Sequence, residues 1–197
     1  MKKEALDFAK RSFDIEAGAI LDTGKCMDWD AFAKAVSLLS RAARIAVSGC
    51  GHSGIACKHF AHSMCCIERP ARFLSPAEAV HGATGFLQPG DVLVVASRGG
   101  KTSELLPIID IARKKKASII SITENASSVM AEKSDVTLPM KPGPETDRYD
   151  AQGTSSFVAL AAVFDALQVA VLEETGFRDE QFALIHPGGA VGARLNS

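Results

Sequence analysis

Apolar residues recur at intervals of three and four through the first forty positions, which is the spacing of one face of an α-helix. A first face is formed by Leu6, Ala9, Phe13, Ala17 and Ile20, and a second by Trp29, Phe32, Val36 and Leu39. Asp28 stands where an N-cap would start the second helix. The pattern predicts an N-terminal helical hairpin over residues 1–43.

After residue 44 the pattern changes to short β-rich runs separated by segments of helical length. Several runs are apolar at consecutive positions, as in strands that helices cover on both faces. We therefore expect a parallel sheet with five strands, at residues 45–48, 72–74, 91–97, 118–123 and 135–138.

The segments between the strands carry helix signals. Ser75 and Glu78 have the spacing of a capping box. An apolar stripe over residues 105–112 predicts another helix, in which Pro107 must lie early because a proline inside a helix kinks it.

The alternation predicts a single α/β domain over residues 1–197, a three-layer α/β/α sandwich with the flavodoxin-like strand order 2-1-3-4-5. Residues 44–197 would form its core and a helical tail. The polar, proline-containing stretch 139–153 predicts a long loop, and loops of that length are commonly functional. Thr154 then opens a further helix.

Composition narrows the function classes. The 22 Lys and Arg residues balance 23 Asp and Glu residues, so there is no electrostatic case for nucleic acid or a membrane surface as partner. No apolar run reaches the roughly 20 residues that cross a bilayer. The five cysteines lack CxxC spacing and are expected to be reduced thiols. We therefore expect a cytoplasmic protein.

Two glycine-bearing loops directly follow the first and third predicted strands, at residues 48–54 and 97–103. In the expected order these strands are neighbours where the order reverses, so both loops face one crevice. Glycine amides such as that of Gly100, hydroxyls at helix starts and a helix N-terminus together suit a phosphate. Arg98 and Lys101 would add charge. Alternatively, the glycine pair is only a turn and both cations are solvated.

Neither a cofactor nor a metal is expected. The first loop matches G-x-G-x-x-G, but the second strand supplies no acidic residue at its tip to hold the ribose of a dinucleotide. His59, His62 and Cys66 are spaced by three and four on one predicted helix. No further ligand joins them at a standard spacing, so packing explains them better than a metal site.

At these loops and in the tail the sequence resembles the sugar isomerase (SIS) domain, and specifically the arabinose 5-phosphate isomerases of the KpsF/GutQ type. The matching stretches are residues 49–54, 76–82, 89–92, 97–104, 154–156 and 176–194, the last containing HPGG. The resemblance implies a phosphosugar ligand and reversible aldose–ketose isomerisation without a redox cofactor. It also implies a homo-oligomer, dimer or tetramer, whose active sites are shared between subunits. Many relatives carry two CBS modules, which this chain is expected to lack.

The resemblance implies roles for particular residues. Ser53, Ser97 and Thr102 match hydroxyl residues of the family's sugar-phosphate site. The matching active-site polar residues are His81, Glu145 and His186, with Glu145 placed by counting back from Thr154.

The sequence also departs from the family at two active-site positions. Where the family loop reads Ser-Asn-Ser-Gly-Glu, this chain has Ser97-Arg98-Gly99-Gly100-Lys101, so a base replaces an acid. His52 replaces the lysine expected in the first loop. These two changes would alter either which phosphosugar is the substrate or whether the chain turns it over at all.

The reaction requires a base beside the sugar carbonyl. We expect Glu145 to be that base, His186 to assist ring opening and His81 to polarise an oxygen, with His52 nearby. Lys101 or Arg98 would stabilise the enediolate. Ordinary structural roles are the alternatives: an exposed loop acid for Glu145, and turn or helix capping for the two histidines. The sequence thus predicts a pentose-phosphate isomerase, or else a phosphosugar-binding module without turnover.

Overall fold

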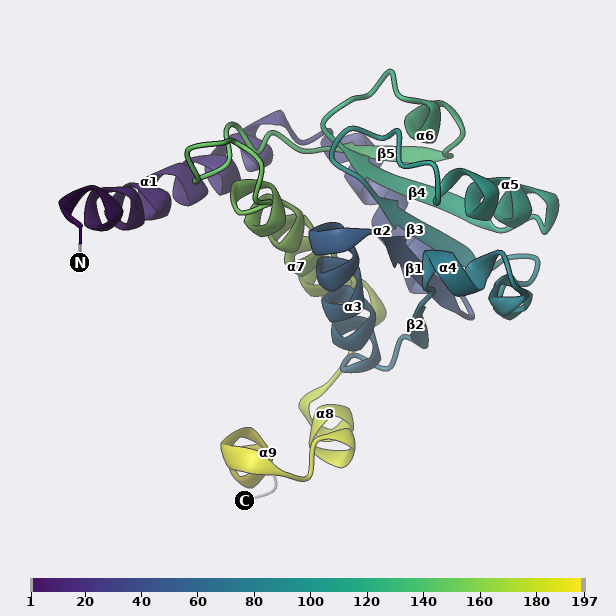
Figure 1. Cartoon of the computed structure of the whole chain (residues 1–197). Coiled ribbons are helices and arrows are strands. Elements are labelled where there is room, and N and C mark those ends of the chain that lie inside the picture. Colours follow the sequence, from purple (N-terminus) through teal and green to yellow (C-terminus); the bar gives the residue numbers. More distant parts are fainter. Residues whose placement is uncertain (1, 196–197) are drawn as a thin grey trace.

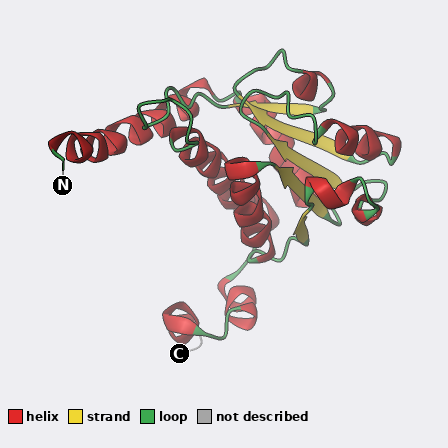
Figure 2. Ribbon diagram, in the orientation of Figure 1, coloured by secondary structure: helices red, strands yellow, loops and turns green. Residues whose placement is uncertain are grey.

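The computed structural model describes residues 2–195 and contains the expected five-stranded parallel sheet (Figures 1 and 2). The strand order is β2-β1-β3-β4-β5, which confirms the predicted fold class and order. The strands are β1 (Ile45–Gly49), β2 (Ala71–Phe73), β3 (Val92–Ala96), β4 (Ser118–Thr123) and β5 (Val136–Pro139).

Helices cover both faces of the sheet and enclose two separate cores. On one face lie α2 (Trp29–Arg41), α3 (Gly51–Cys65) and α7 (Ser155–Thr175), where the rings of Phe60 and Phe164 stack at 4.4 Å. The other face is covered by α4 (Pro76–Ala79), η1 (Ala83–Phe86), α5 (Leu106–Lys114) and α6 (Val129–Glu132). Strands β1, β3 and β4 are buried almost throughout, as their consecutive apolar residues predicted.

Two of the helix predictions have different outcomes. Pro107 lies in the first turn of α5, as predicted. The capping box predicted at Ser75 is wrong, because the Ser75 hydroxyl makes no capping hydrogen bond. The four-residue α4 is instead closed by backbone bonds, with the Ser75 carbonyl accepting from the amides of Glu78 and Ala79.

Helix α1 (Lys3–Cys26) packs on α7 through its C-terminal half, and Phe8, Ala9 and Ser12 border a hollow with the loop at residues 146–148 (Figure 1). Its N-terminal half projects away from the sheet, and Phe13 on the predicted apolar face is 77% exposed. An isolated helical segment of this length gains little stability in water, since packing supplies most of it. No other segment of the described chain covers the apolar side chain of Phe13 on this half of α1.

Helix α7 is apolar on all sides, which is typical of a helix covered on every side. It is the one helix among residues 2–195 that is long and apolar enough to cross a bilayer by length and composition. It contacts α1, α2 and α3, as the core helix of a globular domain does. Its remaining face carries Val169, which is 60% exposed.

The tail consists of α8 (Asp179–Ile185) and α9 (Gly189–Leu195). It leaves the C-terminal end of α7 and lies away from the sheet (Figure 1). No side chain of α8 is buried, and Leu184 is 77% exposed. Like the first half of α1, the tail presents apolar surface that its own chain does not cover.

Candidate active site

The two glycine-bearing loops begin side by side at the carboxyl edge of the sheet. Gly49 ends β1 and pairs in the ladder with Ala96, which ends β3. Because neighbouring strands lie about 4.8 Å apart, the segments that follow start next to each other. The prediction that both loops start at the reversal of strand order is therefore confirmed. That they face one crevice stays a prediction, because none of residues 97–103 lines the cleft beside the first loop.

A cleft of about 490 Å³ opens beside the first loop. Its walls come from the first turn of α3, the segment after β2 and the start of α5, and include Cys50, Gly51, Phe73, Ser75, Val80 and Glu104. The chain packs closely at the base of this loop, because a Cβ on Gly54 would lie 2.6 Å from the Gly49 carbonyl oxygen. Glycines at both positions allow α3 to start directly above β1.

The hydroxyl groups of the second loop face each other. Ser97 Oγ lies 2.8 Å from Thr102 Oγ1 and accepts a hydrogen bond from the Gly100 amide at 3.2 Å. Ser97 is buried. Two hydroxyls and one amide thus converge on one turn of backbone, an arrangement that suits an anionic oxygen.

The backbone conformation and close packing at Gly100 leave no room for a side chain. Its φ is +65°, and a Cβ there would lie 2.1 Å from Ser128 Oγ, the oxygen that caps α6. Gly100→Ala is expected to destabilise the fold by about 1–3 kcal/mol through backbone strain and overpacking, measured as a lower Tm. Gly99→Ala is the control, because nothing lies within 4 Å of its Cβ. Equal melting temperatures for the two variants would contradict this account of the loop.

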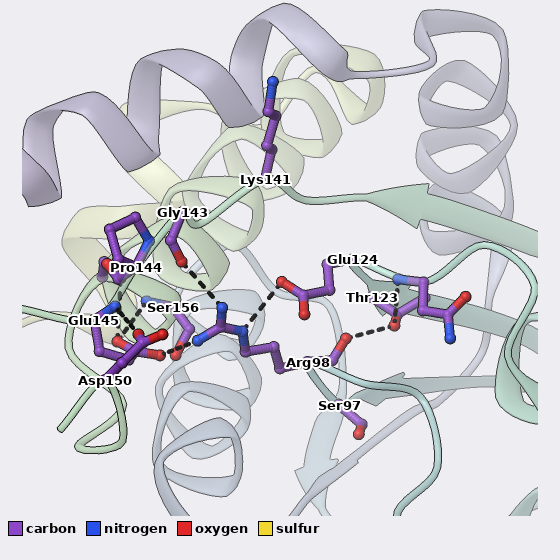
Figure 3. Close-up of polar contacts among 12 residues, drawn as sticks. Ser97, Arg98, Thr123, Glu124, Lys141, Gly143, Pro144, Glu145, Asp150 and Ser156 are labelled. Carbon is purple, nitrogen blue, oxygen red and sulfur yellow. Dashed lines mark hydrogen bonds and ion pairs between the residues drawn. The ribbon is translucent and has the colours of Figure 1, made fainter.

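Arg98 reaches toward the segments that follow β4 and β5 (Figure 3). Its Nε lies 3.1 Å from Glu124 Oε2, and its Nη1 lies 2.7 Å from Glu145 Oε1. Its Nη2 donates to the Gly143 carbonyl at 3.0 Å. The expected phosphate contact of Arg98 stays a prediction, whereas protein acceptors occupy all three of its nitrogens.

Glu145 is buried, with 5% of the residue exposed, so the expectation of an exposed loop acid is wrong. Its Oε2 accepts hydrogen bonds from the Thr154 amide (2.6 Å) and hydroxyl (3.2 Å), the Ser155 hydroxyl (3.1 Å) and the Ser156 amide (3.2 Å). These groups form the start of α7, so the carboxylate caps that helix from a distance. Oε1 accepts from Arg98.

The environment of Glu145 keeps it ionised. Burial alone would raise the pKa of its carboxyl, but the hydrogen bonds from residues 154–156 outweigh burial and hold the pKa below the ordinary glutamate value. Oε1 accepts a hydrogen bond from Arg98 alone, so the ionised carboxylate retains a lone pair on that oxygen.

His52 lies in the first turn of α3 and packs against the loop that leads to α7. A Cβ on Gly153 would lie 2.9 Å from His52 Nδ1, so the ring rests directly on this glycine. Ser53 follows in the same turn and is half-buried. The imidazole therefore lies next to the residue that precedes Thr154, at the helix start that Glu145 caps.

The other predicted polar residues lie farther apart. His81 is exposed in the turn after α4, next to the cleft residue Val80, and Lys101 is exposed in the second loop. His186 follows α8, with its ring centroid 5.0 Å from that of Phe182 and its buried Nδ1 without a hydrogen-bond partner. The tail starts at the opposite end of the 21-residue α7 from Glu145, roughly 30 Å away at 1.5 Å per residue.

Glu124 was not among the residues expected from the sequence, and residues 154–156 were expected only as a matching stretch and not as hydrogen-bond donors to Glu145. Glu124 directly follows β4, and its position at a strand end was the available signal. It borders a second hollow of about 450 Å³ with Arg98, Lys141 and Gly143. In the observed strand order this hollow lies over the β3–β4–β5 side, and the larger cleft lies over the β2–β1 side.

The predicted histidines and Cys66 on and just after α3 make local polar contacts, in which His59 Nε2 also lies 3.5 Å from Ser63 Oγ. His62 Nε2 lies 3.6 Å from Cys66 Sγ, and His59 Nε2 lies 3.5 Å from Asp165 Oδ1. Within the part of the chain that the structure describes, they do not assemble into a group of three metal-ligating side chains.

Comparison with known proteins identifies related chains. A family model, the SIS domain, matches residues 38–170. Arabinose 5-phosphate isomerase KdsD of Pseudomonas aeruginosa is 36% identical over 194 residues, which is 96% of this chain and 59% of the relative. Arabinose 5-phosphate isomerase KpsF of Escherichia coli is 30% identical over 91% of this chain and 55% of the relative. The chain thus spans less than two thirds of the length of these curated relatives.

Solved structures agree with these matches. A Listeria monocytogenes protein, described as a candidate sugar-phosphate isomerase, is 40% identical with a TM-score of 0.91 over 95% of this chain and 100% of that chain. An E. coli CFT073 protein in complex with A5P is 27% identical with a TM-score of 0.86, also over 95% of this chain and 100% of that chain. The matches confirm the resemblance drawn from the two loops and the tail, and the chain belongs to the SIS domain family.

Proposed function

We propose that this chain interconverts an aldose phosphate and a ketose phosphate, of the arabinose 5-phosphate and ribulose 5-phosphate type, through an enediol. The observation that carries the proposal is the meeting of two glycine-bearing loops at paired strand ends, with the Ser97 and Thr102 hydroxyls 2.8 Å apart. The similarity to KdsD and to the protein complexed with A5P supports this substrate class.

The second loop supplies the phosphate contacts in this proposal. Ser97, Thr102 and the Gly100 amide would exchange their present mutual hydrogen bonds for phosphate oxygens, with Ser53 donating from the start of α3. Hydrogen bonds to a charged group are stronger than those between neutral groups, which favours the exchange. Lys101 would add its charge to the phosphate or to the enediolate.

Proton transfer is assigned to the other end of the site. Glu145 would remove the proton from the carbon beside the aldehyde and return it to the aldehyde carbon, while the proton of the neighbouring hydroxyl passes to the former aldehyde oxygen, which converts the aldose into the ketose. Its ionised state and the remaining lone pair on Oε1 support this role. His52 and His81 would polarise the carbonyl and hydroxyl oxygens, and His186 would assist ring opening.

The proposal includes a homo-oligomer that shares its sites between subunits. Within one chain Glu145 caps the start of α7 and His186 follows α8, beyond the other end of α7, so a neighbouring copy would have to supply His186. The exposed apolar surfaces of α1, α7 and the tail support such packing, because patches of this kind mark interfaces. A cytoplasmic setting fits the five cysteines, all of which are free thiols.

The test is turnover of arabinose 5-phosphate by the purified chain, followed as ketose formation, with binding measured in parallel by thermal shift. We expect both turnover and stabilisation. Stabilisation without turnover would overturn the catalytic proposal in favour of a binding module. The test distinguishes these two outcomes because Lys101 and His52 differ from the residues expected in the family. Stabilisation by NAD and not by phosphosugars would overturn the ligand class as well.

A further inference from the structure

One guanidinium joins the ends of three successive strands. Arg98 follows β3, Glu124 follows β4 and the segment 143–145 follows β5. The backbone beneath Arg98 is fixed too, because its carbonyl accepts hydrogen bonds from Thr123 Oγ1 (2.8 Å) and the Glu124 amide (3.0 Å). The side chain therefore starts from a rigid base and ends on Glu145 (Figure 3).

We propose that Arg98 and Glu124 form a clamp that positions Glu145 for proton transfer, so that Arg98 acts through Glu145 and not on the substrate phosphate. This inference rests on the proposed function, in which Glu145 is the base.

The geometry divides the work between the two carboxylate oxygens of Glu145. Oε2 is anchored to the start of α7 by four hydrogen bonds, and Oε1 is set by Arg98 alone. The Glu145 side chain is 3% exposed, so its pair with Arg98 is shielded from water and orients strongly. The Arg98–Glu124 pair is more exposed and adds little stability by itself, but it directs the guanidinium.

Charge changes on the two clamp residues have opposite expected effects on Glu145. Removing the positive charge of Arg98 makes the carboxylate easier to protonate, whereas removing the negative charge of Glu124 makes it harder. Among the other titratable groups near Glu145, Asp150 accepts from the Glu145 amide and His52 packs against Gly153, whereas Lys141 on the same loop directs its side chain away from Glu145 (Figure 3). All three stay unchanged in both variants.

The experiment measures kcat and KM against pH for the wild type, Arg98→Gln and Glu124→Gln. For Arg98→Gln we expect kcat to fall by about tenfold to a hundredfold, because Oε1 loses its fixed position, with a much smaller change in KM. The acid limb of its kcat profile should move to higher pH. In Glu124→Gln the amide oxygen still accepts from Arg98, so kcat should fall less than in Arg98→Gln, and the limb should move to lower pH.

Arg113→Gln is the matched control. Arg113 makes the same kinds of contact as Arg98, an ion pair to Asp135 at 2.8 Å and a bond to the Lys133 carbonyl, but it lies on α5 outside the site. It should change neither kcat nor the acid limb. A higher KM in Arg98→Gln, with kcat and the limb unchanged, would overturn the clamp and return Arg98 to the phosphate.

Failure of the proposed function is distinguishable from failure of the clamp. If the wild type binds phosphosugar without turnover, the catalytic proposal fails. The clamp is then tested by measuring the stability of the wild type and of Arg98→Gln against unfolding at several pH values. Arg98→Gln should then unfold more easily than the wild type at neutral pH, and the difference should shrink as acidification neutralises Glu145. A difference that is absent at neutral pH, or that does not change with pH, would overturn the clamp.

Discussion

Replacing Glu145 with glutamine is expected to lower kcat by about a hundredfold to ten-thousandfold, the range that a general base contributes. The amide has nearly the shape of the carboxylate and retains an oxygen that can accept from the start of α7, but it cannot take up a proton. KM should change little, because the phosphate contacts lie on the Ser97–Thr102 loop. Steady-state kinetics with arabinose 5-phosphate provide the measurement.

Ser97→Ala provides the contrast for that experiment. Removing the Ser97 hydroxyl takes away one hydrogen bond to a charged phosphate, so KM should rise by about tenfold or more while kcat falls less. If Glu145→Gln instead raised KM and preserved kcat, Glu145 would be a binding residue and the assignment of the base would fail.

Acidification gives an independent check on the state of Glu145. Its folded-state pKa lies below the ordinary value because of the hydrogen bonds from residues 154–156. The ionised carboxylate therefore stabilises the fold above the pKa of the unfolded chain, and this contribution is lost as the pH falls through the lower folded-state pKa. The wild type should exceed Glu145→Gln in Tm at neutral pH, and the gap should close in acid.

The sheet was predictable because its signal is local and redundant. Consecutive apolar residues such as Val92–Ala96 can be covered only between two layers of helices, and the glycine-bearing loops mark the ends of β1 and β3. Ser75 shows the limit of local motifs. A capping box requires one particular rotamer of the serine side chain. In α4 the amides of Glu78 and Ala79 donate to the Ser75 carbonyl instead, so the short helix forms without a side-chain cap.

The contacts of Arg98 were not predictable from its loop. Its charge suits a phosphate and a carboxylate equally, and the choice depends on Glu124 and Glu145, which lie 26 and 47 residues away in the sequence. Only the sheet order brings these three strand ends together. Sequence reasoning identified Glu145 through family resemblance, whereas its burial depends on the same long-range packing.

The apolar pattern of α1 was correct for a helix but did not indicate what the helix packs against. Periodicity gives a face and not its partner. Phe13 and Leu184, each 77% exposed, belong to segments that leave the sandwich at different places. In the proposed oligomer a second copy covers them, and that copy also brings a His186 to each site.

Mixing two inactive variants should therefore restore activity. In a site that takes Glu145 from one chain and His186 from its neighbour, a Glu145→Gln chain paired with a His186→Ala chain forms one intact site and one doubly defective site. Random exchange in an equal mixture of dimers leaves about a quarter of all sites intact. Each variant alone should be nearly inactive, so mixing raises the rate by a large factor.

The controls distinguish a failure of subunit exchange from the absence of an active site shared between subunits. The two variants are unfolded and refolded together so that subunits exchange, and differently tagged chains are purified to show that mixed assemblies form. A chain carrying both substitutions, refolded with the wild type, measures how far an inactive neighbour lowers the wild-type rate. Mixed assemblies that remain as inactive as the parents would mean that Glu145 and His186 do not meet across subunits. His186, which follows α8 beyond the far end of α7 in its own chain, would then have no route to the reaction.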